Sequence, residues 1–374
     1  MRLRRLSVRH FRNLGVQDLE LPPEGLALIG NNAQGKSNLL EAIYYLETFR
    51  SFRGARDDQV LGFGEQVFRV AGTVSPEGGA GPSVEVSAAF ERRGKRKKVM
   101  VDGVEPARIG DALGQLAAVI FSPTDVELVS GGPSGRRRFL DIVLSLTETG
   151  YLEALQEYRR TLARRNAALK SGHPGAAVAA WNQGLIRAGT AVILARKEWV
   201  ERRCEAFAGY YAAVSGGPRA LMAYRSNVRL GEGTTPEEIF EAYRDGLMDS
   251  AESERRRGVT LVGPHRDELF LRLHGEREDV DLRDYGSGGQ RRTAALALRL
   301  VEAHTLREVK GREPLVLLDD VFAELDPARS ERVLDLMNRE ETGQVVLTAP
   351  RESDVRIRRD ALPRWRVEGG RISM

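Results

Sequence analysis

The stretch LIGNNAQGKSNLLEA, residues 28–42, fits the pattern G-x-x-x-x-G-K-[S/T] in full between Gly30 and Ser37. The two fixed glycines allow backbone N–H groups to turn inward around phosphate oxygens. The apolar run at residues 26–29 predicts a buried strand before the loop, and apolar residues at helical spacing over 38–46 predict a helix after it. This order aims a helix N-terminus at phosphate, so it predicts a nucleotide-binding P-loop.

The loop supplies the first candidate site residues. Lys36 would place a positive charge on the β- and γ-phosphates of ATP, and the Ser37 hydroxyl would bind Mg²⁺. The motif serves kinases, GTPases, transporters, helicases and DNA-repair proteins alike, so it predicts the ligand but not the function. The candidate cofactor-binding residues here are Gly30, Asn31, Asn32, Ala33, Gln34, Gly35, Lys36, Ser37 and Asn38.

A second part of the nucleotide site is predicted at residues 314–320, where an apolar run ends in Asp319 and Asp320. A buried parallel strand would carry both carboxylates to the carboxyl edge of the sheet, beside the P-loop. This is the Walker B arrangement. We expect Asp319 to hold Mg²⁺ and Asp320 to polarise the attacking water, with Lys36 as the other catalytic residue.

A glycine-rich stretch precedes a helix predicted over 293–309, and its residues Ser287, Gly288, Gly289 and Gln290 form a second candidate anion-binding element. Asp326 follows the Walker B strand in Ala323-Glu324-Leu325-Asp326. The order of these elements resembles the signature, Walker B and D-loop of ABC-type ATPases. In that superfamily the signature closes on the γ-phosphate bound by a second chain, so the resemblance implies a head-to-tail homodimer with ATP between the chains.

Composition limits the class of protein. The chain has 374 residues, with 57 basic and 53 acidic side chains and a net charge of +4. No apolar run is long enough for a membrane span, and the first residues lack the apolar region of a secretory signal. The lone Cys204 cannot form an intrachain disulfide, which fits a cytoplasmic protein. Clustered basic residues suggest contact with phosphate backbones, and the best candidates are the runs at 136–138 and 95–98.

The pattern along the chain predicts an α/β protein: an ABC-type ATPase head, with a P-loop α/β core and an antiparallel β subdomain, plus a compact helical lobe. Strands are expected at 3–9, 16–21, within 67–104 and at 117–121, and an Asp102-Gly103 turn is expected near the end of this region. Helical sequence follows from 134 to 211, and its longest candidate helix, 134–170, would reach about 55 Å. Further elements are a strand at 219–229, a helix at 236–257, and strands at 258–262 and 268–274.

These elements suggest three parts. Residues 1–121 would form the N-terminal half of the head with the P-loop, and 122–258 would form the inserted, mainly helical lobe. Residues 259–374 would form the second half of the head, with the signature, Walker B and D-loop.

Short sequence segments spread over nearly the whole chain resemble those of the RecF family of bacterial recombination proteins. The matching segments lie at 11–13, 30–42, 50–53, 121–125, 132–141 and 261–267, together with the signature and Walker B. The resemblance implies a weak DNA-dependent ATPase that forms an ATP-dependent homodimer and binds double-stranded and gapped DNA without strong sequence preference. It also implies action with RecR and RecO to load RecA, and no membrane partner. By the same resemblance, Arg12 and Asn13 would border the adenine or ribose.

The sequence departs from ABC-type heads at three places, of which the first two imply slow hydrolysis. Asp320 stands where Glu is usual, Thr348 stands where a switch His is usual, and no Gln occurs at 121–123. The P-loop is also compatible with two other functions: the nucleotide-binding subunit of a transporter, which the inserted lobe disfavours, and a P-loop kinase, which has no use for the signature. His265 could be catalytic, but we expect it to pack near the start of a strand.

Overall fold

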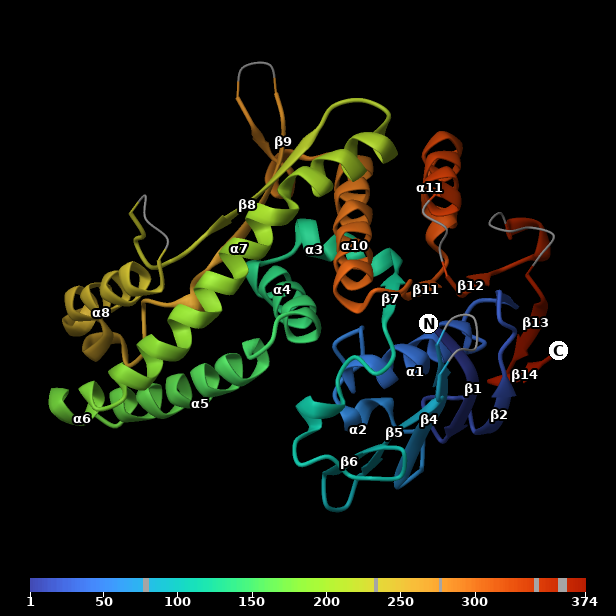
Figure 1. The fold of residues 1–374 in the computed structure, drawn as a ribbon, viewed down its shortest axis with the longest axis horizontal. Helices are drawn as coiled ribbons and strands as arrows, with labels where there is room; N and C mark the ends of the chain where they lie inside the picture. Colours follow the sequence, from blue (N-terminus) through green and yellow to red (C-terminus); the bar gives the residue numbers. More distant parts are fainter. Residues whose placement is uncertain (77–80, 232–234, 276–277, 340–342, 356–361) are drawn as a thin grey trace. The chain divides into compact units, whose positions relative to one another are not determined.

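The computed structural model describes residues 1–76, 81–231, 235–275, 278–339, 343–355 and 362–374 (Figure 1). Contacts divide the chain into two units. The first contains residues 1–125, 213–216 and 296–374, and the second contains 126–212 and 217–295. The signature at 287–290 therefore belongs to the second unit. The predicted division after residues 121 and 258 stays a prediction about folding domains.

The first unit contains a six-stranded sheet that positions the P-loop. Five of its strands run parallel and the edge strand β14 is antiparallel. Because the carboxyl ends of parallel strands meet at one edge, the residues after β3 and β11 lie on the same side of the sheet. In spatial order the strands are β14 (Arg371–Ser373), β13 (Arg364–Glu368), β3 (Gly25–Ile29), β12 (Val345–Ala349), β11 (Leu315–Leu318) and β7 (Ala118–Phe121).

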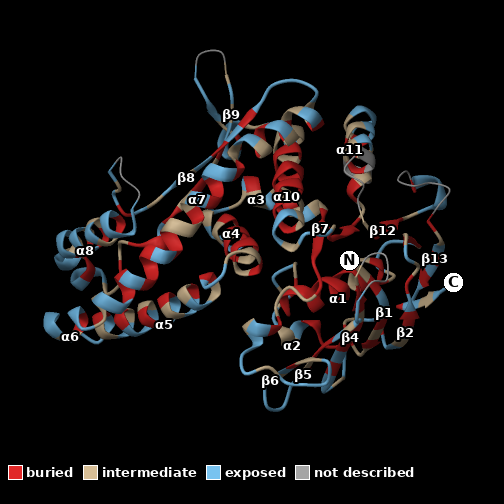
Figure 2. Ribbon diagram, in the orientation of Figure 1, coloured by how far each residue is buried: buried red, intermediate tan, exposed pale blue. Residues whose placement is uncertain are grey.

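A second, antiparallel sheet completes this unit. Helix α1 (Lys36–Thr48) contacts strands of both sheets and is buried along most of its length (Figure 2). One hydrophobic core includes side chains from α1 and from both sheets. The strands predicted in the first 121 residues are confirmed, as is the Asp102-Gly103 turn, which is closed by a Val101–Val104 bridge. In spatial order the second sheet contains β2 (Val16–Glu20), β1 (Arg2–Arg9), β4 (Val67–Ser75), β5 (Val84–Glu91) and β6 (Arg96–Val101).

Helices dominate the second unit, which also holds a three-stranded antiparallel sheet in the order β10, β9, β8. Helices α7 and α10 contribute residues to both units. Helix α11 (Pro327–Arg339) and the short α2 (Asp57–Val60) belong to the first unit. The remaining elements are α3 (Val126–Ser130), α4 (Pro133–Thr147), α5 (Tyr151–Lys170), α6 (Gly175–Ala179), α7 (Asn182–Ser215), β8 (Ala220–Arg225), α8 (Pro236–Arg257), β9 (Glu268–Leu273), β10 (Val280–Asp281), α9 (Leu282–Tyr285) and α10 (Gly288–Lys310).

Two predicted elements are wrong. The helix expected over 134–170 is two helices, because Gly150 has φ +78° and this left-handed conformation separates α4 from α5. The strand expected over 258–262 is irregular, because side chains satisfy its backbone: Thr260 N–H donates to Asn166 Oδ1 and Leu261 N–H donates to Glu254 Oε1. The longest helix described is instead α7, with 34 residues.

Helix α10 begins at Gly288, several residues before the predicted start at 293. The signature glycines therefore form its first turn. Within the described ranges, no helix is both long enough and apolar enough to cross a membrane.

Candidate nucleotide-binding site

The P-loop connects β3 to α1, and Lys36 is the first residue of that helix. Gly35 precedes it with φ +113°, a conformation that side-chain-bearing residues rarely adopt. Lys36 is 4% exposed, and its Nζ donates to the carbonyl oxygens of Gly30, at 2.7 Å, and Asn31, at 3.2 Å. The lysine cation and the helix N-terminus therefore lie in one loop, as phosphate binding requires.

The loop is braced by two distant segments through Gln34. The N–H groups of Gly369 and Gly370, in the turn between β13 and β14, donate to Gln34 Oε1 at 2.7 Å and to Gln34 O at 2.8 Å. Asn13 Nδ2 donates to the same carbonyl at 3.2 Å, and Asn38 Nδ2 donates to Asn13 Oδ1 at 2.8 Å. Gln34, Asn13 and Asn38 thus shape the loop, and their contact with nucleotide stays a prediction.

Ser37 and Asp319 meet at the carboxyl edge of the sheet. Ser37 Oγ donates to Asp319 Oδ1 at 2.5 Å, although the residues lie on α1 and after β11. Asp319 is 6% exposed, and its burial raises the pKa of the carboxyl group, while the Ser37 hydrogen bond and the nearby Arg53 lower it. A hydroxyl and a carboxylate are hard oxygen ligands of the kind that Mg²⁺ prefers.

The chemistry of this pair fits a metal bound together with a nucleotide. In the described segments, no group of three or more His, Cys, Asp or Glu side chains could hold a metal ion. Mg²⁺ typically binds through one or two carboxylates plus water and substrate phosphates, so Ser37 and Asp319 suffice when phosphate oxygens complete the coordination.

Thr348, at the position where a switch His was expected, contacts both acidic residues. Its Oγ1 lies 3.1 Å from Asp320 Oδ1 and 3.2 Å from Asp319 Oδ1, and it accepts the Asp320 N–H at 2.9 Å. Asp320 itself has φ +48°. The sequence indicated only that a histidine is missing at Thr348, because the local pattern does not reveal that β12 pairs with β11, the strand that Asp320 follows.

Arg53 is a second residue that the sequence reasoning missed. Its guanidinium donates to Asn38 Oδ1 at 3.1 Å and lies 3.8 Å from Asp319 Oδ2 and 3.7 Å from Glu41 Oε2. It also covers the Phe52 ring. The only signal was its place in the segment 50–53 that resembles the RecF family.

Arg12 is held by a buried carboxylate. Its Nε and Nη2 donate to the two oxygens of Glu41 at 3.0 and 2.8 Å, and its Nη1 donates to Gln59 O at 2.9 Å. Glu41 is fully buried on α1 and also accepts the Ser51 hydroxyl. This geometry shows a bracket between the β1–β2 turn and α1, and contact with the adenine stays a prediction.

Arg12→Ala is expected to lower the free energy of unfolding by about 3 kcal/mol, because it removes the bidentate partner of a buried carboxylate. Chemical denaturation checks this, with Arg9→Ala as the matched control. Arg9 pairs with Asp18 at the surface, so its loss should cost about 1 kcal/mol or less. An unchanged ratio of ATP to GTP affinity in folded Arg12→Ala would contradict the base contact.

The signature residues cap α10. Ser287 N–H donates to Gln290 Oε1 at 2.8 Å, and Gln290 N–H donates to Ser287 Oγ at 3.2 Å. Ser287 and Gly288 are exposed. Asp326 is also exposed and accepts the Arg329 N–H at the start of α11, which lowers the pKa of its carboxyl group. Each of these roles is local, and contact with nucleotide on a second chain stays a prediction.

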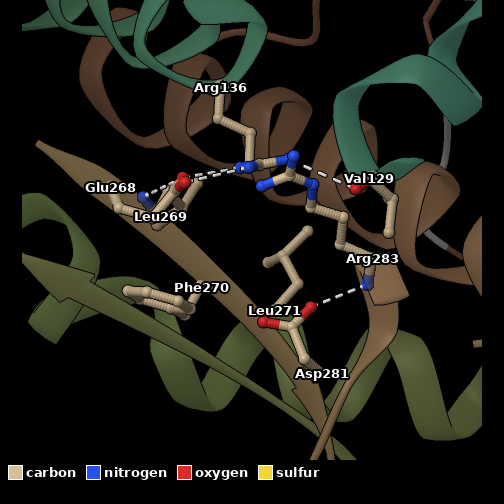
Figure 3. A pocket seen from close by; sticks show the side chains of 8 residues that line it. All are labelled: Val129, Arg136, Glu268, Leu269, Phe270, Leu271, Asp281 and Arg283. Atoms are coloured by element: carbon tan, nitrogen blue, oxygen red, sulfur yellow. Dashed lines mark hydrogen bonds and ion pairs between the residues drawn. The ribbon is translucent and has the colours of Figure 1, made fainter. Parts of the chain in front are cut away.

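Two residues of the predicted DNA-binding runs are structural instead. Arg136 is 3% exposed, forms a bidentate ion pair with Glu268 at 2.8 and 3.1 Å, and donates to Val129 O (Figure 3). Lys97 donates to Phe49 O and pairs with Asp57 at 2.8 Å. Both are therefore wrong as phosphate contacts. Lys95, Arg96 and Lys98 are exposed at the β5–β6 hairpin.

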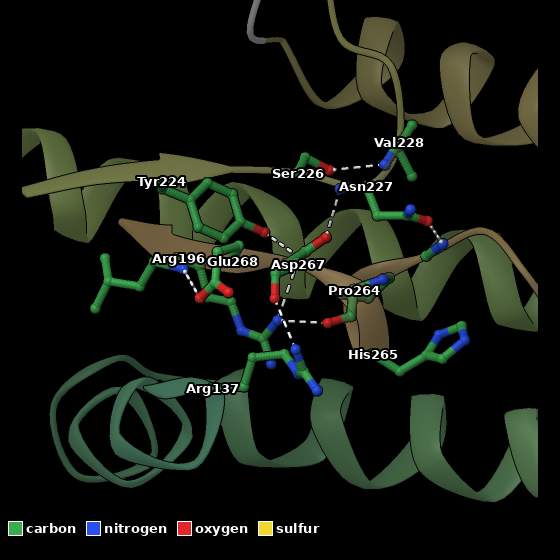
Figure 4. Close-up of polar contacts among 12 residues, drawn as sticks. Arg137, Arg196, Tyr224, Ser226, Asn227, Val228, Pro264, His265, Asp267 and Glu268 are labelled. Carbon is green, nitrogen blue, oxygen red and sulfur yellow. Dashed lines mark hydrogen bonds and ion pairs between the residues drawn. The ribbon is translucent and has the colours of Figure 1, made fainter. Parts of the chain in front are cut away.

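His265 packs, as expected, before β9, in a short turn at Pro264–Arg266 (Figure 4). Burial lowers the pKa of its imidazole to about 4. The neutral ring must donate from Nε2 to Thr260 O, at 3.1 Å, because a carbonyl can only accept. Its Nδ1 therefore accepts the Tyr158 hydroxyl at 2.6 Å.

Comparison with known proteins places this site in context. Residues 2–362 match the model of the RecF/RecN/SMC N-terminal domain. The chain is 39% identical to the DNA replication and repair protein RecF of Nostoc punctiforme, over 90% of this chain and 89% of that protein. It is 35% identical to RecF of Salinibacter ruber, over 94% and 85% of the two chains.

Solved structures also show a similarity to RecF. A structure of the recombination mediator protein RecF with ATP, from the RecFOR pathway, is 31% identical, has a TM-score of 0.90 and covers 99% of this chain and 96% of its own. The Smc head domain of Pyrococcus furiosus, bound to a domain of ScpA, is 16% identical with a TM-score of 0.55, over 99% and 95% of the two chains. The second likeness concerns the fold alone.

Proposed function

The chain belongs to the RecF family of DNA replication and repair proteins, within the RecF/RecN/SMC ATPases, and from this premise we propose that it is an ATP-dependent DNA-binding clamp of recombinational repair. The observation that supports this best is the meeting of Lys36, Ser37 and Asp319 at one edge of the sheet. That edge can hold a nucleotide phosphate and its metal. Membership of this family disfavours the transporter and kinase alternatives.

In this proposal each residue at the edge has a separate task. Lys36 exchanges the Gly30 and Asn31 carbonyls for β- and γ-phosphate oxygens. Ser37 and Asp319 hold Mg²⁺, which when bound neutralises charge on the phosphates. Asp320 orients and polarises the attacking water. Because Asp is one methylene shorter than the Glu usual at this position, it holds that water less closely, and hydrolysis is slow.

A second chain completes the site. Ser287, Gly288, Gly289 and Gln290 at the N-terminus of α10, with Asp326 at the start of α11, face the γ-phosphate bound by the partner. ATP then links two heads, and slow hydrolysis releases them. This cycle suits a clamp that stays on DNA better than a motor that moves along it.

Thr348→Val is expected to lower the rate of ATP hydrolysis about fivefold while ATP affinity stays within about twofold. Valine keeps the shape of threonine but removes the hydroxyl that lies between Asp319 and Asp320, so the acidic pair loses a positioning hydrogen bond worth about 1 kcal/mol. Single-turnover hydrolysis separates this step from binding. Thr348→Ser is the matched control, because it retains the hydroxyl, and equal loss in both variants would contradict the role.

The DNA and protein partners follow from the family. The relatives are DNA replication and repair proteins, and one solved structure is a recombination mediator of the RecFOR pathway. We propose that this chain binds double-stranded and gapped DNA largely without sequence preference and acts with RecR and RecO to load RecA. Exposed Lys95, Arg96 and Lys98 are candidate phosphate contacts in the first unit.

The test is DNA binding with and without ATP, with mass in solution followed in parallel. We expect ATP to double the mass and to strengthen DNA binding in the same concentration range. Lys36→Met should show neither change. DNA binding that is independent of ATP, with a constant mass, would contradict the clamp.

A further inference from the structure

A cavity of about 240 Å³ lies in the second unit, and none of its lining residues belongs to the P-loop or the signature. Helices α4, α5 and α7 and the turn before β9 form its walls. Four arginines line it, against one carboxylate, and a tyrosine hydroxyl joins them. These residues are Arg137, Arg138, Arg159, Arg196, Asp141 and Tyr158.

Two of the arginines form ion pairs with carboxylates. Arg196 is 2% exposed and pairs with Asp141 at 2.8 Å and with Asp267 at 3.2 Å. Arg159 shares Asp141 at 2.7 Å, and its side chain is more than half exposed at the rim. Asp141 thus forms ion pairs with two arginines, so its one negative charge cannot fully neutralise both.

Arg137 is the cation that these carboxylates do not neutralise. It is half-buried, and its Nη1 donates to the backbone carbonyl of Asp267 at 2.8 Å. In the part of the chain that the structure describes, it forms no ion pair. Burial and the neighbouring Arg196 lower the pKa of its guanidinium, and the nearby carboxylates of Asp267, Glu268 and Asp141 offset this only in part. A buried charge is costly unless it is paired, so this wall of the cavity favours an anion.

The floor of the cavity is held rigidly from behind. Asp267 accepts the Tyr224 hydroxyl and the Asn227 N–H, and Arg196 donates to Pro264 O at 2.8 Å. The neutral His265 fixes the Tyr158 hydroxyl. Figure 4 shows Arg137 and Arg196 reaching toward Asp267 from the same side. Arg137 and Arg196 are therefore positioned before any ligand arrives, which lowers the entropic cost of binding at Arg137.

We propose that this cavity binds a phosphate group of the DNA backbone, through Arg137 and Arg159 with Arg138 at the rim. Planar guanidinium groups match phosphate oxygens through paired N–H donors. Arg138, Arg159 and Ser134 line the cavity and are exposed, so the cavity is open to solvent there and the bound phosphate can belong to a longer polymer. The identity of this ligand rests on the proposed DNA-binding function.

The test compares the double variant Arg137→Gln, Arg159→Gln with wild type in duplex DNA binding across salt concentrations. Loss of one phosphate contact should lower the magnitude of the slope of log affinity against log salt by about 0.9. Arg160→Gln is the matched control: Arg160 is exposed on α5 beside Arg159, pairs with Glu157 and does not line the cavity. The control should leave the slope unchanged.

A second arm titrates inorganic phosphate by calorimetry into Lys36→Met, whose P-loop is disabled, with and without the double change. Phosphate binding that the double change removes, with an unchanged DNA slope, overturns the assignment to DNA and identifies a free-phosphate site. An unchanged slope and no phosphate binding overturn the site altogether. If the wild-type protein binds no DNA, the proposed function is contradicted, and DNA is then excluded as the source of the phosphate.

Thermal melting checks that the double variant is folded. ATP affinity, which depends on the P-loop in the first unit, checks that this unit is unaffected. If the double variant unfolds, Arg159→Gln alone decides, because its side chain is mostly exposed. The single variant should lower the slope in the same direction relative to Arg160→Gln, and equality of the two overturns the proposal.

Discussion

Lys36→Met is expected to weaken ATP binding about 100-fold and to abolish ATP-driven dimerisation. The ammonium group of Lys36 is the only charge that the P-loop sequence 30–37 offers to phosphate, and it already lies between the loop carbonyls of Gly30 and Asn31. Charge-assisted hydrogen bonds contribute about 1.5–3 kcal/mol each, and two of them at the lower end of this range account for this loss of affinity. Methionine has a similar length and volume, so the buried position stays filled.

Equilibrium binding of ATP and sedimentation with and without ATP measure both effects. Lys98→Met is the matched control, because Lys98 is an exposed lysine on β6 and lies outside the P-loop. It should bind ATP and dimerise as wild type does. A dimer that forms with ATP in Lys36→Met, or wild type whose mass ignores ATP, would show that nucleotide does not join the two chains.

Mixing two inactive variants is expected to restore ATP hydrolysis, to at most about one active site per mixed dimer. Lys36→Met alone cannot hold the phosphates. Ser287→Arg alone places a bulky side chain at the exposed N-terminus of α10, where the partner's γ-phosphate would lie. In a mixed dimer one composite site has both lesions, and the other joins the intact P-loop of one chain to the intact signature of its partner.

Hydrolysis measured across mixing ratios should pass through a maximum near equal amounts, since mixed dimers are then most abundant. Recovery of ATP-dependent dimerisation provides a second readout that does not require turnover. Ser250→Arg, on α8 and outside the signature, is the control for added charge and bulk in the second unit. If neither hydrolysis nor dimerisation returns at any ratio while both variants remain folded, the two chains do not share their sites.

The nucleotide site was predictable from the sequence because its parts are short and local. A P-loop needs particular residues at fixed spacing to shape one backbone turn, and Lys36 and Ser37 lie where that spacing puts them. The apolar run before Asp319 predicted a buried strand, and parallel pairing then had to bring that carboxylate to the edge shared with the P-loop. Family membership was likewise predictable, because short sequence motifs along the chain resemble those of the family.

Partners far apart in sequence were not predictable, because burial and ion pairing depend on what the fold brings alongside. Arg136 stands in an arginine run that suggested DNA contact, yet its partner is Glu268, on β9. The sequence showed only that Thr348 stands where a histidine is usual. The structure shows that its hydroxyl, on β12, contacts Asp320. The turn at Gly369 and Gly370 braces Gln34 from the far end of the chain.

The sequence by itself determined the family, and it predicted the ligand class and the sheet edge that carries the P-loop. Only the tertiary structure decided which charged side chains form ion pairs inside the protein and which can contact a ligand. Arg136 and Arg137 are adjacent and chemically identical, but the first faces Glu268 and the second faces a cavity that holds more arginines than carboxylates. The physical reason is that the state of a charge depends on its neighbours in space, and successive residues of a helix point in different directions.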